Sequence, residues 1–109
     1  MELTPRPEAP IACDMSTARD TPDERLAEYG ALFERALLSR ERRSEAVVLT
    51  FRGDVREQVE DLARREHACC PFLGYRVETA GDQVVWTISG DERPGAQATL
   101  DAFHALAER

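Results

Sequence analysis

Apolar positions recur at a helical spacing in three stretches of the chain. The first stretch has a recognisable start, because Thr21-Pro22-Asp23-Glu24 combines an N-cap, a proline at the first helical position and a capping-box glutamate. We therefore expect a first helix that runs from Pro22 to about Arg40, with an apolar face formed by Leu26, Tyr29, Phe33 and Leu37. The charged stretch 39–45 is expected to be its solvated end and a loop.

A second helix is expected to begin after Asp54, which has Glu57 three residues later as a second capping box. It should end at Cys69 and Cys70, because Pro71 lacks an amide hydrogen and disfavours a helical conformation in the residue before it. A third helix should start at Pro94. The apolar faces of the two helices are expected to be Val55, Val59, Leu62 and Ala63, and then Leu100, Phe103 and Leu106 or Ala107.

Three shorter stretches alternate apolar and polar residues, which is typical of half-buried strands. They cover residues 46–51, 75–79 and 84–88, and the turn Gly81-Asp82 should join the last two as an antiparallel hairpin. The predicted order is therefore α-β-α-β-β-α. This order indicates an α+β fold, a two-layer sandwich in which helices pack on a small, three-stranded and mostly antiparallel sheet.

The length of 109 residues fits one domain. Residues 1–20 hold three of the six prolines and only scattered apolar side chains, so we expect a mobile leader there, followed by a single domain over 21–109. The edges of a three-stranded sheet are unprotected, which leaves both a homodimer and a monomer open.

Charge and hydropathy exclude several functional classes. The net charge is −7, and such a surface repels phosphates, which argues against a nucleic-acid or anionic-membrane partner. No apolar run reaches the roughly 18 residues of a membrane helix, and no basic region followed by an apolar stretch marks a secretory signal. We therefore expect a cytoplasmic protein.

The three cysteines, Cys13, Cys69 and Cys70, are the most informative residues. An odd number does not describe a disulfide framework, and a bridge between adjacent cysteines would close a very small ring. A single buried cysteine is often simple packing. Neighbouring helical residues point about 100° apart, so Cys69 and Cys70 cannot both complete one apolar face. A redox dithiol lacks the usual Cys-x-x-Cys spacing.

The position of Cys69 and Cys70 at a helix C-terminus favours a bound cation over a nucleophilic thiolate, since the helix dipole is negative there. Two thiolates seldom suffice, so a third ligand should come from elsewhere, and Cys13 beside the apolar Ile11 is the obvious donor. Its alternative is an unremarkable thiol on a tail. A three-thiolate site suits Zn(II), Cu(I) and heavier thiophilic ions such as Hg(II).

Other polar residues near the pair are auxiliary candidates. Glu66 projects onto the apolar face of the second helix, where it could assist the cysteines as an acceptor or proton carrier, or extend to solvent at the rim. His67 or Asp14 could complete a fourth ligand position, although a lone histidine is more often a surface residue. His104 lies among polar neighbours and is expected to have no role.

Two segments resemble a group of small bacterial domains that occur alone or fused to MerR-type regulators, in settings that suggest mercury or other thiophilic metals. The resemblance lies in Ile11-Ala12-Cys13 and in Glu66-x-x-Cys69-Cys70-Pro71-Phe72, and it extends from about residue 10 to the last helix. It implies that Cys13, Cys69 and Cys70 act together with Glu66. This chain departs from the fused members because it has no helix-turn-helix portion, which argues against a transcription factor acting alone.

The sequence therefore predicts a soft-metal binding domain that acts as a sensor, scavenger or chaperone, with no catalytic residues. Two rivals remain. One is an enzyme resembling organomercurial lyase in its groups, in which two sulfurs hold the metal while Asp14 or Glu66 protonates the departing carbon. The other is a protein-interaction module in which the cysteines are structural.

Overall fold

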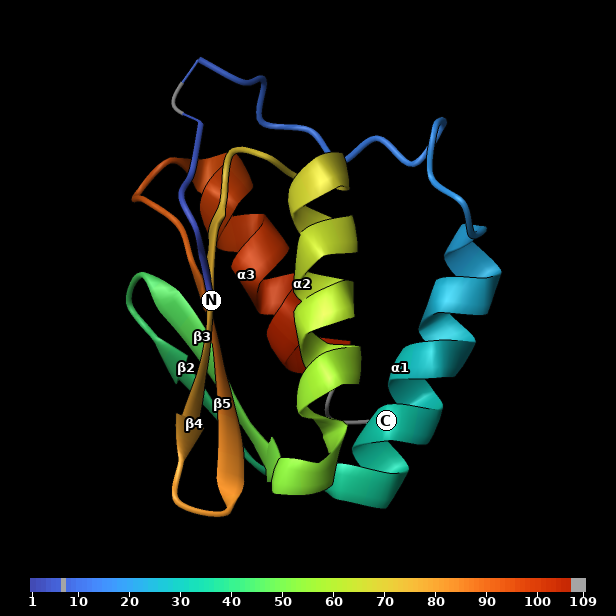
Figure 1. The fold of residues 1–109 in the computed structure, drawn as a ribbon. Coiled ribbons are helices and arrows are strands. Elements are labelled where there is room, and N and C mark those ends of the chain that lie inside the picture. Colours follow the sequence, from blue (N-terminus) through green and yellow to red (C-terminus); the bar gives the residue numbers. More distant parts are fainter. Residues whose placement is uncertain (7, 107–109) are drawn as a thin grey trace.

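A computed structural model describes residues 1–6 and 8–106 of the chain (Figure 1). Within these residues the chain forms three α-helices, one short 3-10 helix and five strands. The elements are β1 (Glu2–Leu3), α1 (Pro22–Ala36), β2 (Leu37–Arg43), β3 (Ala46–Arg52), η1 (Gly53–Val55), α2 (Arg56–Cys69), β4 (Gly74–Ala80), β5 (Gln83–Ser89) and α3 (Pro94–Leu106).

The strands form one sheet in the order β1-β4-β5-β3-β2, and every neighbouring pair is antiparallel. The helices lie on one side of the sheet, and α2 lies between the sheet and α1 in the view of Figure 1. Alternate residues of β3 and β5 are buried, so one face of the sheet provides the core. At its centre, Trp86 of β5 stacks on Tyr29 of α1 with ring centroids 6.3 Å apart.

The chain is α+β, but the predicted three-stranded sheet and the order α-β-α-β-β-α are wrong. The described residues form a five-stranded sheet, and their order is β-α-β-β-α-β-β-α. The predicted hairpin is confirmed, with Gly81 at a positive φ of 63° in its turn. That backbone conformation favours glycine over residues with a Cβ atom.

The strand β2 was missed because it has no apolar face to reveal it. Its sequence, Leu-Leu-Ser-Arg-Glu-Arg-Arg, pairs with β3 on one side only, and most of its residues are exposed. An edge strand of this kind is held by backbone hydrogen bonds and protected by charge, neither of which produces an alternating hydropathy pattern. Consequently α1 ends at Ala36 rather than near Arg40.

The strand β1 was missed because only two residues take part. Glu2 and Leu3 pair with Arg76 and Tyr75 of β4. A strand of two residues is too short to show an alternation of apolar and polar side chains. It places the start of the chain along the outer edge of β4.

The capping box of α1 is confirmed, since Thr21 and Glu24 exchange both hydrogen bonds. The predicted apolar face is rotated, however. Leu26 is 43% exposed, and the buried face is Arg25, Tyr29, Leu32, Phe33 and Ala36. An arginine therefore begins the face that packs against the core.

The second helix begins differently from the prediction and ends as predicted. Residues Gly53–Val55 form the 3-10 turn η1, and α2 starts at Arg56 with no side-chain cap, so Asp54 does not cap it. The helix ends at Cys69, with Cys70 as its C-cap. In α3, Leu100 and Phe103 are buried, whereas Ala107 lies outside the described residues. No helix within residues 1–6 and 8–106 is long and apolar enough to cross a membrane.

Candidate thiol site

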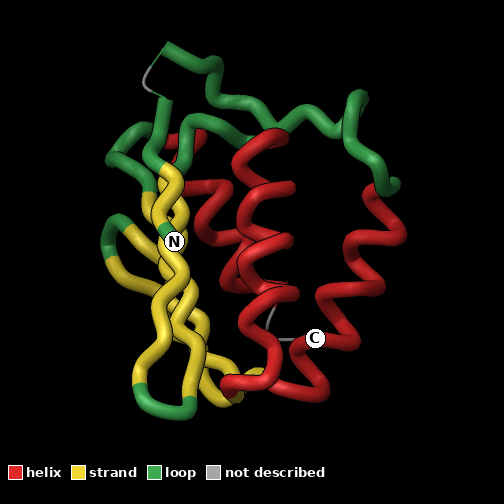
Figure 2. Tube along the Cα trace, in the orientation of Figure 1, coloured by secondary structure: helices red, strands yellow, loops and turns green. Residues whose placement is uncertain are grey.

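The C-terminal end of α2 and the N-terminal segment lie side by side. In Figure 2 the loop after β1 passes over the end of α2 before it reaches α1. Two backbone hydrogen bonds hold it there: Asp14 N–H donates to the Cys69 carbonyl at 2.9 Å, and Arg6 N–H donates to the Pro71 carbonyl at 2.8 Å. The Cys69 carbonyl at the helix end and the Pro71 carbonyl just beyond it are thus satisfied by a segment more than 50 residues away in sequence.

The hydroxyl of Tyr75 fixes the same helix end from the sheet. It donates to the Cys70 carbonyl at 3.0 Å and lies 3.3 Å from the Glu66 carbonyl. Burial raises the pKa of this phenol, so it stays a neutral donor. The last turn of α2 is therefore held between β4 and the N-terminal segment.

Cys13 and Cys70 form a disulfide that links positions 57 residues apart. Cys13 is exposed and Cys70 is buried, whereas Cys69 is a buried free thiol. The structure thus joins the leader cysteine to one member of the adjacent pair. Because Cys13 is an exposed residue, a thiol from solvent can approach this bond from its side.

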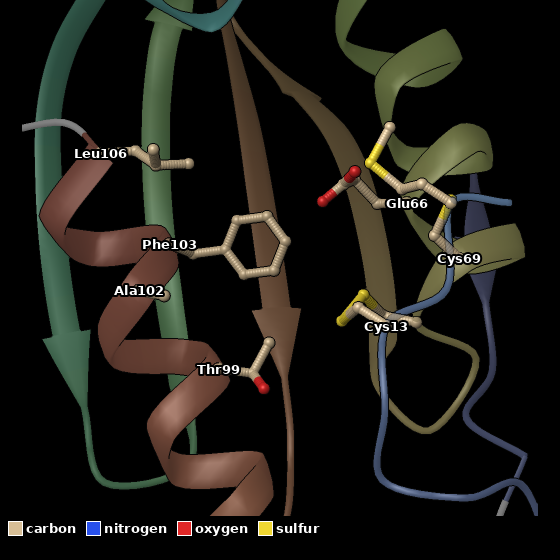
Figure 3. A pocket seen from close by; sticks show the side chains of 9 residues that line it. Cys13, Glu66, Cys69, Thr99, Ala102, Phe103 and Leu106 are labelled. Atoms are coloured by element: carbon tan, nitrogen blue, oxygen red, sulfur yellow. A yellow bond between two sulfur atoms is a disulfide. The ribbon is translucent and has the colours of Figure 1, made fainter. Parts of the chain in front are cut away.

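All three cysteines line one cavity of about 220 Å³. Figure 3 shows α3 on the opposite side of this cavity, with the Phe103 ring directed toward the Glu66 carboxylate and the Cys13 sulfur. The other lining residues are Met15, Thr99, Ala102 and Leu106. The cavity therefore places three sulfur atoms and one carboxylate beside a wall that is mainly hydrocarbon.

A buried arginine reaches this cluster from α1. The Arg25 guanidinium donates to Glu66 Oε1 through Nη1, and the same nitrogen lies 3.6 Å from Cys69 Sγ. Its other nitrogens bind Asp20, at 2.6 Å to Oδ1 and 2.9 Å to Oδ2. One guanidinium thus serves two carboxylates and places a positive charge beside the free sulfur.

The two carboxylates that share Arg25 differ in protonation. The bidentate bond to Arg25 holds the pKa of Asp20 well below its usual range. Burial raises the pKa of Glu66, and the bond to Arg25 opposes this rise only in part. Glu66 is therefore the carboxyl that takes up a proton first, while Asp20 keeps its charge and continues to neutralise Arg25.

The remaining candidate residues lie away from the cavity. His67 Nε2 is 2.9 Å from the Thr4 carbonyl, and its ring meets Tyr75 edge-on on the side of β1. The carboxylate of Asp14 is exposed and accepts from Ser16 N–H at 2.9 Å. The His104 carbonyl lies 3.4 Å from Arg40 Nη1. Only Glu66, of the auxiliary candidates, lines the cavity together with the cysteines.

With Cys13 bonded to Cys70, residues 1–6 and 8–106 contain no group of three or more His, Cys, Asp or Glu side chains that could hold a metal ion. Reduction of the disulfide would supply two further thiols, so the donor set fits a soft ion only in the reduced protein. Comparison of the chain with family models, curated proteins and solved structures finds no match. The function is therefore inferred from the site itself.

Sequence reasoning missed Arg25 and the wall formed by α3. A signal for Arg25 existed, because it lies four, seven and eight residues before Tyr29, Leu32 and Phe33 on one helical face. A charged residue on that face indicates a buried partner. The wall carried no such signal, since Phe103 and Leu106 resemble ordinary core residues in sequence.

Proposed function

We propose that the reduced protein binds a thiophilic metal ion through Cys13, Cys69 and Cys70 and acts as a cytoplasmic sensor, scavenger or chaperone. The observation that carries this proposal is the convergence of the three cysteines on one cavity, with Cys13 and Cys70 close enough to share a bond. Zn(II), Hg(II) and Cu(I) are the ions that such a donor set suits.

Cys13 and Cys70 need only a small rearrangement to share one metal ion after reduction. Two sulfurs on one tetrahedral metal lie roughly 3.8 Å apart, given metal–sulfur bonds of about 2.3 Å. The sulfurs of Cys13 and Cys70 would separate by a short distance after the disulfide is broken. Thiols are kept reduced in the cytoplasm, where the site would be available to a metal.

Charge around the site supports a thiolate cluster. Three thiolates and Glu66 would be strongly negative together, and the guanidinium of Arg25, which also binds Asp20, lies beside Cys69 Sγ and offsets part of this charge. The carbonyl ends of α2 also favour a cation. Glu66 is the auxiliary residue in this proposal. Its carboxylate oxygen would be the fourth metal ligand, or it would accept the proton that a cysteine thiol loses on binding the metal.

A metal titration of the reduced protein tests this proposal. Cys13→Ser, Cys69→Ser and Cys70→Ser should each weaken Zn(II) or Hg(II) binding by at least tenfold, because each removes one soft donor. His67→Ala is the matched control, since His67 faces β1 and should leave affinity unchanged. Equal affinity in the three cysteine variants and the parent would contradict the proposal.

A second candidate function is cleavage of a carbon–metal bond, and the position of the Glu66 carboxyl group beside the cysteines favours it. Glu66 lines the cavity with the cysteines, and burial raises its pKa. In this reaction the carbon–mercury bond breaks, its electron pair takes the carboxyl proton to form a hydrocarbon, and Hg(II) remains on two thiolates. No oxidant or reductant takes part in the step.

Release of benzene from phenylmercury by the reduced protein would establish this second function. Glu66→Gln should then abolish release while mercury binding persists, because glutamine cannot donate the proton. Metal binding without any benzene would leave the first proposal standing and reject the second.

A further inference from the structure

The cavity beside the cysteines has two chemically different sides. Sulfur and the Glu66 carboxylate lie at the end of α2, whereas Phe103, Leu106 and Ala102 present hydrocarbon from α3 (Figure 3). Thr99 adds little polarity to that wall, because its hydroxyl donates to the Gly95 carbonyl at 2.9 Å. A bare ion would use the sulfur side and leave the apolar side without a partner.

The size of the cavity suits an organic group. An apolar cavity of about 150 Å³ holds a benzene molecule, and this one measures about 220 Å³. A second cavity of about 270 Å³ shares Met15, Glu66 and Leu106 with it and extends toward Tyr29. The space beside the sulfurs therefore accommodates a phenyl ring in addition to a metal.

We propose that the preferred ligand is a thiophilic metal cation that carries one apolar organic group, with phenylmercury(II) as its representative. The metal lies on the cysteine sulfurs and the ring lies against Phe103 and Leu106. This inference rests on the proposed metal-binding function and specifies its ligand class.

The binding step is a ligand exchange without electron transfer. A cysteine thiol loses its proton to solvent, the sulfur–mercury bond forms, and mercury releases its aqueous ligand while keeping its bond to carbon. One thiolate neutralises the single positive charge of such a cation. The bound group is thus uncharged, which suits a cavity whose Arg25 is already paired with Asp20 and Glu66.

Native mass spectrometry of the reduced protein, in competition with glutathione, tests this inference. Phenylmercury and methylmercury are compared, since both bind a thiolate but only the first carries a ring. We expect the protein to favour phenylmercury over methylmercury by tenfold to a hundredfold relative to glutathione, on the order of what burial of one ring supplies.

Ala102→Trp provides the critical variant because Ala102 is exposed, lines the cavity and can be enlarged without disturbing the core. Ala102→Trp should lower the preference for phenylmercury over methylmercury by at least tenfold. It should change the affinity for methylmercury by less than twofold. Ala105→Trp is the matched control on the same helix, since Ala105 is exposed and does not line the cavity. It should leave both ligands unaffected.

The outcomes separate this inference from the function on which it rests. If the protein retains both mercurials better than glutathione without a phenyl preference, the ligand class is wrong and metal binding stands. If it retains neither, the metal-binding proposal itself is wrong. An equal effect of Ala102→Trp on both ligands also overturns the inference, because it would show obstruction of the metal and not of the ring.

Discussion

The sheet core and the cysteine end of the molecule are held together in different ways. In the core, β3, β5 and β4 pair over their whole length, and alternate side chains such as Leu49 and Trp86 are completely buried. At the cysteine end, a loop segment is attached to α2 by one disulfide and a few backbone hydrogen bonds. The first region depends on packing, so we expect its stability to be independent of redox state, whereas the second depends on a bond that a reductant can break.

Loss of the disulfide should have the largest effect on stability. Its closed loop spans 57 residues, so a chain-entropy estimate gives a loss of about 4 kcal/mol for reduction or for Cys13→Ser. Urea unfolding of the oxidised and reduced protein measures this difference. We expect hydrogen exchange to increase along 8–20, which would establish the mobile leader in the reduced state, while β3 and β5 remain protected. A loss below about 1 kcal/mol would show that the segment is attached by other contacts.

Leu49→Ala should destabilise the protein by about 3 kcal/mol, because it removes a fully buried side chain from the centre of the sheet. The loss of stability should be the same in the oxidised and reduced states, since β3 pairs with β2 and β5 and not with the segment that carries Cys13. Thr50→Ala, on the opposite face of the same strand, is the control and should change stability by about 0.5 kcal/mol or less. A redox-dependent effect of Leu49→Ala would show that the two regions are coupled.

Arg25→Met removes a buried guanidinium at the cysteine end and should cost about 2 kcal/mol. It leaves the buried Glu66 carboxylate without its partner and removes the bidentate bond to Asp20. Arg25→Lys should recover part of the loss by restoring the charge. Chemical denaturation at neutral pH measures both variants, and an unchanged midpoint for Arg25→Met would show that the cluster contributes nothing to folding.

The pH dependence of stability should be the smallest effect and should have two opposite limbs. The pKa values of Asp20 and Glu28 are lowered by Arg25 and Arg65, so their contribution is present above ordinary values of 3.8 and 4.5 and is lost as pH falls. Burial raises the pKa of Glu66, so its ionisation lowers stability as pH rises above 4.5 through the folded-state value.

Urea midpoints measured from pH 2 to pH 9 check these limbs. Asp20→Asn should flatten the acid limb, and Glu66→Gln should flatten the decline above pH 4.5, because each removes one titrating group. A steeper decline in Glu66→Gln would contradict the assignment of that limb to Glu66.

The sequence predicts well those helices and strands whose apolar residues repeat at a regular spacing, because that spacing reflects burial within the element itself. Residues 75–79 and 84–88 alternate because one face is buried, and the Thr21 capping box is complete within four residues. The strand β2 breaks this relation, since most of its residues are exposed and its position is set by pairing with β3. A pattern method has no signal for a strand of that kind.

The candidate site also has a part that the sequence predicts and a part that depends on the fold. Residue type and position along the second helix nominated Cys69, Cys70 and Glu66, and Cys13 was nominated as the remaining soft donor, beside the apolar Ile11. The pairing of Cys13 with Cys70 depends on how the N-terminal segment crosses the end of α2, which local sequence does not specify. His67 was nominated by proximity in sequence, and the structure directs it toward Thr4 instead.

X-ray absorption of the reduced, zinc-loaded protein tests the central claim most directly, because it counts the sulfur atoms bound to the metal. We expect three sulfurs at about 2.3 Å from the zinc ion, falling to two in Cys13→Ser. Two or fewer sulfurs in the parent protein, or an unchanged count in Cys13→Ser, would show that the three cysteines do not share one ion.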